Sequence, residues 1–427
     1  MDANHYNISF KNKTFLPFFL TQFLGAFNDN ILRNAVIFIY IFSNTNTSPE
    51  AHILYTNIVL FLFVFPTLIF SPLAGKLSDK YEKSKYIQLL KIFEVLIMIL
   101  ASISIIFHFY YLSLIPIILI SIQYTLFGPV KYSLPTALFK NKTLKEANGF
   151  ISASTQFAIL VASMLASFII ATKFIPEYFI SFILILTSIL GYASSKHIPI
   201  NSPNDKNITL SLNFYSTIKQ NLNLIYKKKN IFHIIICLSW FWFLSVSFIN
   251  ILPMLVNTLL NTANNETIFS FIYVILIIGI SIGSLACKFF KNNNSKIICA
   301  LSLLFISLIS LLLVFNNPNT SKINNLSAIF LNGYFQYLSI SIFFLGFCFG
   351  IYFVQLMYQL EIRSPNNKVS QIIAGNNFLN AIFMILSAIS SSFIINLLQI
   401  SIIHYLVIIS FINILVITYL IKFYSIK

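Results

Sequence analysis

Long apolar runs alternate with short polar stretches along the whole chain. A helix needs about 20 predominantly apolar residues to cross a bilayer, and each run is about that long or longer. The pattern predicts an all-α membrane protein with twelve transmembrane helices, at 15–42, 53–74, 86–108, 112–139, 148–171, 178–195, 231–257, 268–289, 297–315, 329–359, 372–398 and 401–423.

The polar stretch in the middle of the chain divides these runs into two sets of six. We expect a first half at 1–195, a cytoplasmic linker at 196–230 and a second half at 231–427. After the second run the chain reads GKLSDKYEKSK (75–85), and after the eighth it reads GSLACKFFK (283–291), with Gly, Leu and Lys at matching offsets. This repeat predicts two pseudo-symmetric six-helix halves, which in transporters meet at a site near the membrane midplane.

The composition excludes soluble and disordered proteins. Only 9% of the residues are charged, 58% are hydrophobic, and the mean hydropathy is +0.85. A soluble domain carries about 25% charged residues, and a disordered segment has low hydrophobicity. The four cysteines lie in apolar runs without metal-ligand spacing, which is typical of small buried hydrophobes.

The net charge of +16, from 27 Lys and Arg against 11 Asp and Glu, raises the question of a nucleic-acid partner. Most of the basic residues, however, fall in the connections on the side that holds the N-terminus, including 75–85, 140–147 and 196–230. Cytoplasmic loops of membrane proteins carry this excess. We therefore expect a multi-pass protein with both termini cytoplasmic, and a nucleic-acid partner is not needed to explain the charge.

The first apolar run contains ionisable residues, in the segment TQFLGAFNDNILRNA (21–35). A charge at membrane depth costs about 2.5–3.5 kcal/mol or more, so such residues face a cavity or the bundle interior. Helical spacing places Gln22, Asp29 and Arg33 on one face. Asp29 and Arg33 are four residues apart and close enough to pair. They form either a structural ion pair or part of a ligand site.

Two further runs carry polar residues of the same kind. In the fourth run, GPVKYSLP (128–135) contains Lys131, which is either buried or extended toward the cytoplasmic interface. In the eleventh run, Asn376 and Asn380 lie on one helical stripe. Amides on one face of a spanning helix favour a polar lumen, although polar residues also join helices to one another.

The stretch after the second run predicts a conformational latch made by Gly75, Asp79 and Lys80. Gly75 permits a tight helix end. Asp79 is expected to accept from the N-terminal amides of the next helix or from a neighbouring lysine. Lys80 lies at the anionic leaflet surface. The alternative is an ordinary basic cytoplasmic loop.

Signatures of catalysis are absent from the sequence. It contains no G-x-x-x-x-G-K-[ST], no H-E-x-x-H and no G-x-S-x-G. No histidine precedes an aspartate at the spacing of a His/Asp acyltransferase. We expect no enzyme activity, no catalytic residues, no metal and no cofactor.

These motifs resemble known transporters. Twelve runs with Gly75, Leu77, Asp79 and Lys80 after the second resemble the major facilitator superfamily, although Glu82 stands where that family usually has Gly. The blocks TQFLGAFNDN, GPVKYS, KEANGF, WFWFL and GNNFLNAIFMILSA resemble the bacterial lysophospholipid transporter family.

The resemblance implies a transporter of lysophospholipids, chiefly lysophosphatidylethanolamine, across the bacterial inner membrane for re-acylation. It also implies an acyltransferase or acyl-activating enzyme as a partner in trans, and places Asp29 and Asn30 in a central cavity. In chemical terms, Arg33 or Lys131 suits a phosphodiester and Asp29 an ammonium group. Asp29 and Glu94 are the embedded carboxylates that suit proton coupling.

Two other functions remain open at this stage. One is a major facilitator transporter of another polar solute or a drug, which would share the architecture. The other is a membrane scaffold or lipid-modifying enzyme. Transport by alternating access, with the halves rocking around the site, is the mechanism that the pattern favours.

Overall fold

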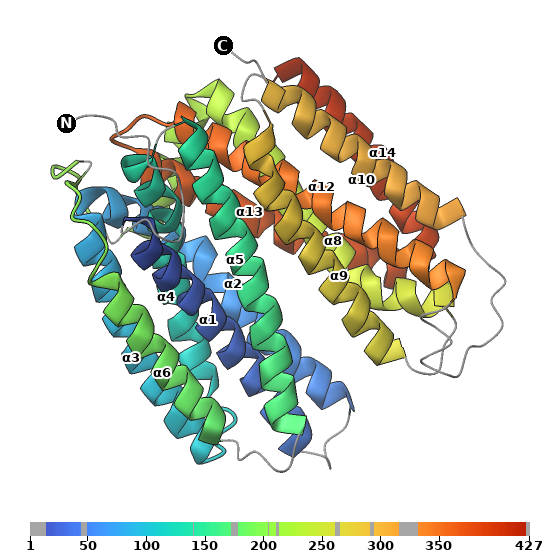
Figure 1. Ribbon diagram of the computed structural model, residues 1–427, viewed down its shortest axis with the longest axis horizontal. Coiled ribbons are helices and arrows are strands. Elements are labelled where there is room, and N and C mark those ends of the chain that lie inside the picture. The colour runs from blue at the N-terminus through green and yellow to red at the C-terminus, as the bar shows by residue number, and fades with distance from the viewer. Residues whose placement is uncertain are drawn as a thin grey trace. The chain divides into compact units, whose positions relative to one another are not determined.

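The computed structural model describes residues 14–43, 49–139, 141–171, 178–203, 205–210, 213–260, 265–290, 294–315 and 332–423. These residues form helices without strands (Figure 1). In chain order the α-helices are α1 (Phe15–Ser43), α2 (Pro49–Lys80), α3 (Lys83–Ile106), α4 (Leu114–Leu138), α5 (Asn141–Ala171), α6 (Tyr178–Ser195), α7 (Phe214–Tyr226), α8 (Lys229–Leu260), α9 (Asn265–Ala286), α10 (Ser295–Phe315), α12 (Gly333–Arg363), α13 (Val369–Ser392) and α14 (Ile402–Phe423). Two short segments, Cys287–Phe289 and Phe393–Leu397, form a 3₁₀ turn and a π turn.

Each of the twelve apolar runs corresponds to one long helix. Within the described residues, eleven helices are long and apolar enough to cross a membrane. The twelfth long helix is α1, which spans 29 residues and carries the polar residues of the first run. The remaining helix, α7, has 13 residues and lies in the middle stretch. The prediction of an all-α membrane protein is confirmed.

The chain forms two compact units, which are described separately below. The first contains 1–147, 154–227 and 361–378, and the second contains 148–153, 228–360 and 379–427. Short pieces of α5 and α13 therefore group with the opposite unit from the rest of their helices. The domain boundaries expected at 195 and 231 stay a prediction.

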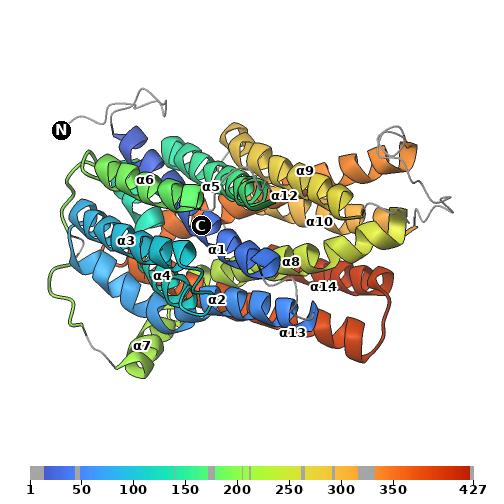
Figure 2. The same ribbon diagram turned by 90° about the horizontal axis from the view of Figure 1, so that it is seen from below.

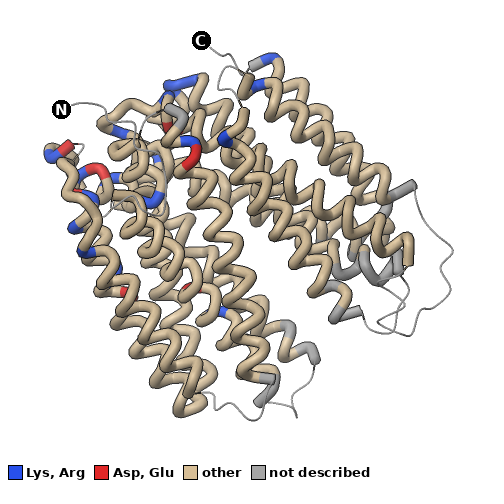
Figure 3. Tube along the Cα trace, in the orientation of Figure 1, with Lys and Arg blue, Asp and Glu red and all other residues tan. Residues whose placement is uncertain are grey.

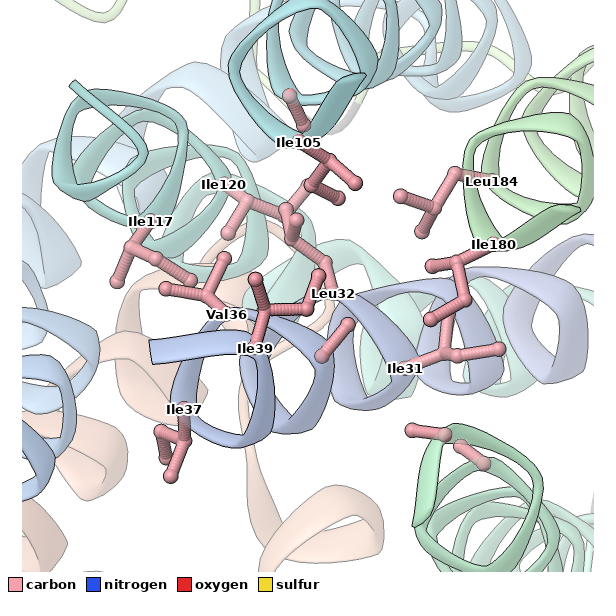
Figure 4. Close-up of a cluster of buried hydrophobic side chains, with 14 of the residues drawn as sticks. Ile31, Leu32, Val36, Ile37, Ile39, Ile105, Ile117, Ile120, Ile180 and Leu184 are labelled. Carbon is pink, nitrogen blue, oxygen red and sulfur yellow. The ribbon is translucent and has the colours of Figure 1, made fainter. Parts of the chain in front are cut away.

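In the first unit, α3 packs along α6, α1 along α6, and α2 along α4; α3 and α6 lie side by side in Figures 1 and 2. Between α1, α3, α4 and α6 lies a core of buried aliphatic side chains, shown in Figure 4. Ile31, Leu32, Ile117, Ile120 and Ile180 in this core are fully buried. Since lipid is as apolar as leucine, close packing rather than water exclusion holds such helices together.

The second unit repeats this pairing. Its α10 packs along α14, and α14 along α8, as α3 packs along α6 and α6 along α1 in the first unit. The repeat agrees with the pseudo-symmetry read from the sequence.

Glycines let α9 and α12 approach backbone to backbone within this unit. A Cβ atom on Gly283 would lie 2.8 Å from the backbone carbon of Phe347, and one on Gly350 would lie 2.6 Å from the Ser284 nitrogen. Gly279 and Gly346 face the partner helix in the same way. Small residues four apart on both helices are the usual means of such close approach.

The helices extend past the apolar runs at several ends, and this corrects one expectation. Residues 75–80 are the last turns of α2 and not a loop, so Gly75 lies inside a helix. Backbone hydrogen bonding does not stop at the hydrocarbon boundary, whereas the hydropathy signal does. Between α2 and α3 only Tyr81 and Glu82 intervene, and Glu82 caps α3 by accepting from the backbone amides of Ser84 and Lys85.

Lysines and arginines of the first unit gather at the end of its helices where α1 begins, and a few charges lie deeper along them (Figure 3). Both chain ends, 1–13 and 424–427, lie outside the described residues. The cytoplasmic location of the termini stays a prediction.

Candidate functional site

The polar stripe of α1 is buried inside the first unit. Gln22, Asp29 and Asn30 are 1%, 4% and 7% exposed, and Arg33 is half-buried. Gln22 and Asp29 are about two helical turns apart, and Asp29 and Arg33 about one turn. Helix α1 therefore places these side chains on one face. The expectation that this face avoids lipid agrees with their burial.

Arg33 contacts Asn30 rather than following the pairing expected with Asp29. Its Nη2 donates to Asn30 Oδ1 at 2.7 Å, and its guanidinium carbon lies 5.1 Å from the centre of the Phe63 ring. Asn30 in turn donates through Nδ2 to the Ala26 carbonyl. Arg33 and Asn30 are therefore hydrogen-bonded to each other at the end of the stripe opposite Gln22.

Lys131 is buried, which decides between the two positions left open for it. Its side chain is 8% exposed, and Nζ donates to Thr155 Oγ1 at 2.9 Å. Thr155 Oγ1 donates to Gln22 Oε1 at 3.2 Å, and Gln22 Nε2 donates to Ser154 Oγ. This chain of hydrogen bonds links α4, α5 and α1.

A second charged group lies on α3 beside the same stripe. Lys91 Nζ is 2.6 Å from Glu94 Oε2, and both side chains are 1% exposed. Glu94 also accepts from Gln123 Nε2 at 3.1 Å and from Asn28 Nδ2 at 3.4 Å. A buried ion pair is tolerated when further hydrogen bonds satisfy its remaining atoms, and these two amides do so for the carboxylate.

Gly25 on α1 makes room for Lys91. A Cβ atom at Gly25 would collide with Lys91 Nζ, and one at Gly191 on α6 would lie 3.7 Å from it. The lysine head therefore sits in a gap between two helices that only glycine leaves wide enough on the α1 side.

Asp29 lies among these charges with one oxygen atom unsatisfied. Its Oδ1 atom is buried and has no hydrogen-bond partner. Glu94, Lys91, Lys131 and Arg33 all act on it electrostatically. We call these five groups the charged cluster: three cations and two carboxylates, all in the first unit. Its formal balance is one positive charge in excess.

The two asparagines expected on one stripe fall in different units. Asn376 belongs to the first unit, and its Oδ1 is buried without a hydrogen-bond partner. Asn380 belongs to the second unit and accepts from Ser239 Oγ at 3.0 Å. The structure thus connects Gln22 with Lys131 and Asn30 with Arg33, and neither asparagine of α13 hydrogen-bonds to them within the described residues.

The predicted latch residue Asp79 is fully buried at the start of α13. Its carboxylate accepts from the backbone amides of Ser370 at 3.2 Å and Gln371 at 3.1 Å. Amides in the first turn of a helix have no acceptor within the helix, and a negative charge there also interacts favourably with the positive end of the helix dipole. The expected partner type, N-terminal amides, is observed, but they belong to α13 and not to the next helix in sequence.

Gly75 allows this approach, and Lys80 takes no part in it. A Cβ atom at Gly75 would lie 2.6 Å from Ala374 Cβ and 2.8 Å from Gln371 Cα. Ser71 Oγ on the same helix donates to the Ala374 carbonyl at 2.7 Å. Among the described residues, the hydrogen bonds to α13 at this end do not include the Lys80 side chain.

Helix α7, which the sequence left inside the linker, also holds α13. Asn213 caps α7 through a bond from the Ser216 amide, and Asn221 Nδ2 donates to the Gln371 carbonyl at 2.8 Å. Side chains at Gly375 would collide with Asn221 and Ile225. The first turns of α13 are therefore in contact with both α2 and α7.

The described residues offer no candidate metal site, since no group of three or more His, Cys, Asp or Glu side chains gathers among them.

Comparison with known proteins decides the family. The family model described as Major Facilitator Superfamily matches residues 18–388. The chain belongs to the Major Facilitator Superfamily.

Solved structures of this superfamily share the fold. The human organic anion transporter MFSD10 (TETRAN) superposes with a TM-score of 0.76 over 96% of this chain and 99% of that one, at 10% identity. The fucose:proton symporter FucP of Escherichia coli gives 0.71 over 97% and 98%, also at 10% identity. At this identity the likeness concerns the fold alone.

Curated relatives match a shorter part of the chain. Proteins named lysophospholipid transporter LplT from Escherichia coli and Citrobacter koseri are each 28% identical over 163 residues. The match covers 38% of this chain and 38% of each relative. This member of the superfamily is thus a multi-pass membrane transporter whose similarity to LplT extends over a little more than a third of either chain.

Sequence reasoning missed Lys91 as a part of the charged cluster, and Asn28 and Gln123 as the amides that donate to its Glu94. The signal for the first was present: opposite charges three residues apart in an apolar run, at Lys91 and Glu94, predict a buried pair. The amides carry no such signal, because their partners come from other helices.

Proposed function

We propose that this major facilitator transporter moves lysophospholipids, chiefly lysophosphatidylethanolamine, across the bacterial inner membrane by alternating access. The observation that carries the proposal is the charged cluster of the first unit, with its excess positive charge and its unsatisfied Asp29 oxygen. The partial similarity to LplT supports the same substrate.

The cluster suits a zwitterionic headgroup. A phosphodiester carries one negative charge, which would balance the excess cation, and Arg33 offers the planar fork that matches phosphate oxygens. The headgroup ammonium has donors only, and Asp29 Oδ1 is a buried acceptor that lacks a donor. Gln22, Asn30 and Lys131 would complete the binding site, together with Asn376 from α13, whereas Asn380 belongs to the second unit.

The contacts of Gly75 and Asp79 with α13 suit a conformational latch. Charge-assisted hydrogen bonds to helix-terminal amides are strong enough to favour one conformer and few enough to be released in turnover. Lys80 would act at the leaflet surface. In this proposal both termini are cytoplasmic, and an acyltransferase or acyl-activating enzyme re-acylates the product in trans.

The second candidate is transport of another polar solute or a drug. The fold favours it equally, because the structural neighbours include transporters of an organic anion and of fucose. The two proposals differ in what the cluster binds. A soluble solute needs no apolar groove for an acyl chain, whereas a lysophospholipid does.

The test is flipping of fluorescent lysophosphatidylethanolamine in proteoliposomes that contain the purified protein. We expect flipping that unlabelled lysophosphatidylethanolamine inhibits and that Asp29→Ala and Arg33→Ala each reduce by at least about tenfold, since each removes one charged hydrogen-bonding group. Ser302→Ala, in the second unit and outside the charged cluster, serves as the control, since it loses only a hydrogen bond within its own helix. Flipping that survives in the Asp29→Ala/Arg33→Ala double variant would refute the site. Competition by a soluble solute but not by lysolipid would favour the second candidate.

A further inference from the structure

The second unit contains an apolar groove that the charged cluster does not involve. It has a volume of about 410 Å³ and runs along α8 and α14, with Phe232, Ile236 and Trp240 on α8, Leu415 and Tyr419 on α14, and Phe383 on α13. The spacing of these residues places them on one face of each helix. Cavities of about 300–1,000 Å³ are the size that holds small ligands.

The indole N–H of Trp240, which lines the groove, is already hydrogen-bonded within the protein. Trp240 is 7% exposed, and its Nε1 donates to Asn413 Oδ1 at 2.8 Å. Asn413 Nδ2 donates to the Leu303 carbonyl and to Ser307 Oγ. Since these polar groups are satisfied inside the protein, the surface that remains is apolar and suits a hydrocarbon chain.

One end of the groove is polar and positively charged. His233 and Tyr419 are joined by a hydrogen bond there. Lys229, one turn before His233, acts on it electrostatically and is exposed. Lys422, which is also exposed, lies three residues after Tyr419 in the last turn of α14. Two lysines at the end of a groove between membrane-spanning helices complement an anionic headgroup.

We propose that this groove binds an anionic membrane phospholipid, with one acyl chain along Phe232, Trp240 and Leu415 and the headgroup phosphate at Lys229 and Lys422. The occupant is a diacyl lipid of the leaflet that meets the ends of α8 and α14 that carry Lys229 and Lys422. The site is separate from the charged cluster, lies within one unit, and goes beyond the transport proposed above. A zwitterionic lipid would fill the same groove but would gain less from the lysines.

Trp240 provides a direct readout, because the chain contains only two tryptophans. Trp242→Phe leaves Trp240, which lines the groove, as the single tryptophan of the chain. The full chain is reconstituted in vesicles with dibrominated phosphatidylglycerol or dibrominated phosphatidylcholine at equal mole fraction. We expect the bromines of phosphatidylglycerol to quench Trp240 with an apparent affinity about fivefold higher for each contributing lysine.

Matched variants separate this site from general lipid contact. Lys229→Gln with Lys422→Gln should abolish the preference for phosphatidylglycerol, whereas Lys288→Gln, a basic residue of the same unit away from the groove, should leave it unchanged. Val416→Phe should weaken quenching by both lipids, and helix content by circular dichroism checks that each variant folds. Equal quenching by the two lipids in the parent protein, or a preference that persists without both lysines, would overturn the proposal.

Discussion

Lys91 Nζ lies 2.6 Å from Glu94 Oε2 within one turn of α3, and the two side chains are almost completely buried. Taking both charges out of water is expensive, and their attraction repays the cost only when the geometry and the further hydrogen bonds are good. Here Gln123 and Asn28 supply those bonds to the carboxylate. The intact pair therefore lowers the stability of the fold little, whereas removal of one partner lowers it strongly.

This asymmetry predicts a strongly coupled double-mutant cycle. Lys91→Met or Glu94→Met alone should lower the free energy of unfolding by about 3–5 kcal/mol, because each leaves an uncompensated buried charge. The double variant Lys91→Met/Glu94→Met should lie close to the parent protein. Unfolding by sodium dodecyl sulfate in mixed micelles measures all four proteins. Additive single effects would contradict the pairing.

The bonds from Asp79 to α13 predict a change in amide exchange. Asp79→Asn keeps the size of the side chain but loses its charge. A hydrogen bond to a charged group is worth about 1.5–3 kcal/mol, so the amides of Ser370 and Gln371 should exchange roughly ten- to a hundredfold faster. Hydrogen–deuterium exchange of a peptide over 369–375 reports this. Lys80→Gln is the control, and equal acceleration by both variants would argue against a specific contact.

The close approach of α9 to α12 predicts that a single methyl group added at Gly283 lowers the stability of the protein. In Gly283→Ala the new Cβ meets the backbone of Phe347, which cannot rotate away as a side chain can. Overpacking of this kind costs about 1–3 kcal/mol, so the melting temperature in detergent should fall. Gly333→Ala is the matched control, since a Cβ at Gly333 has nothing within 4 Å. Equal melting temperatures of the two variants would disprove the close contact.

The link from Lys131 to Gln22 predicts an effect on substrate affinity, and this rests on the proposed function. Thr155→Val removes the acceptor for Lys131 Nζ and the donor to Gln22. A misplaced cation should raise KM for lysophosphatidylethanolamine about tenfold, while the maximal rate changes less. Thr67→Val, which breaks only a hydroxyl pair with Thr125, serves for comparison. A fall in maximal rate at constant KM would assign Thr155 a different role.

Glu82 gives the fold a defined dependence on pH. Burial alone would raise the pKa of this carboxyl, but bonds from the backbone amides of Asn201, Ser84 and Lys85 outweigh it and hold the pKa below its usual range. A lowered pKa means that the stabilisation is present in full above about pH 4.3, the ordinary value, and is lost as the pH falls through the folded-state value. The difference in stability between the parent protein and Glu82→Gln should therefore shrink below pH 4. A constant difference down to pH 3 would contradict this.

Hydropathy was sufficient to predict the helices, because the demand for about 20 apolar residues per crossing leaves few alternatives. All twelve runs are helical, and Gln22, Asp29 and Lys131 are buried as the cost of charge in lipid requires. The ends were less accurate. Residues 75–80 read as a loop because they are polar, yet α2 continues through them.

The hydrogen-bond partners of the buried polar side chains were the part that the sequence could not supply. Arg33 and Asp29 have the spacing of a pair, but Asn30, one residue nearer to Arg33 along α1, receives a hydrogen bond from it. Likewise the amides that meet Asp79 come from α13, almost three hundred residues later. The glycines at 279, 283, 346 and 350 do carry a signal, the four-residue spacing of close-packed helices, which helical hydropathy alone overlooks.

That seam of glycines has a mechanical consequence. At these four glycines the backbones of α9 and α12 lie against each other, without intervening side chains whose rotamers can adjust. We therefore expect α9 and α12 to move together as one rigid element of the second unit. If this expectation holds, bending during transport is concentrated in other helices of the unit or in their connections.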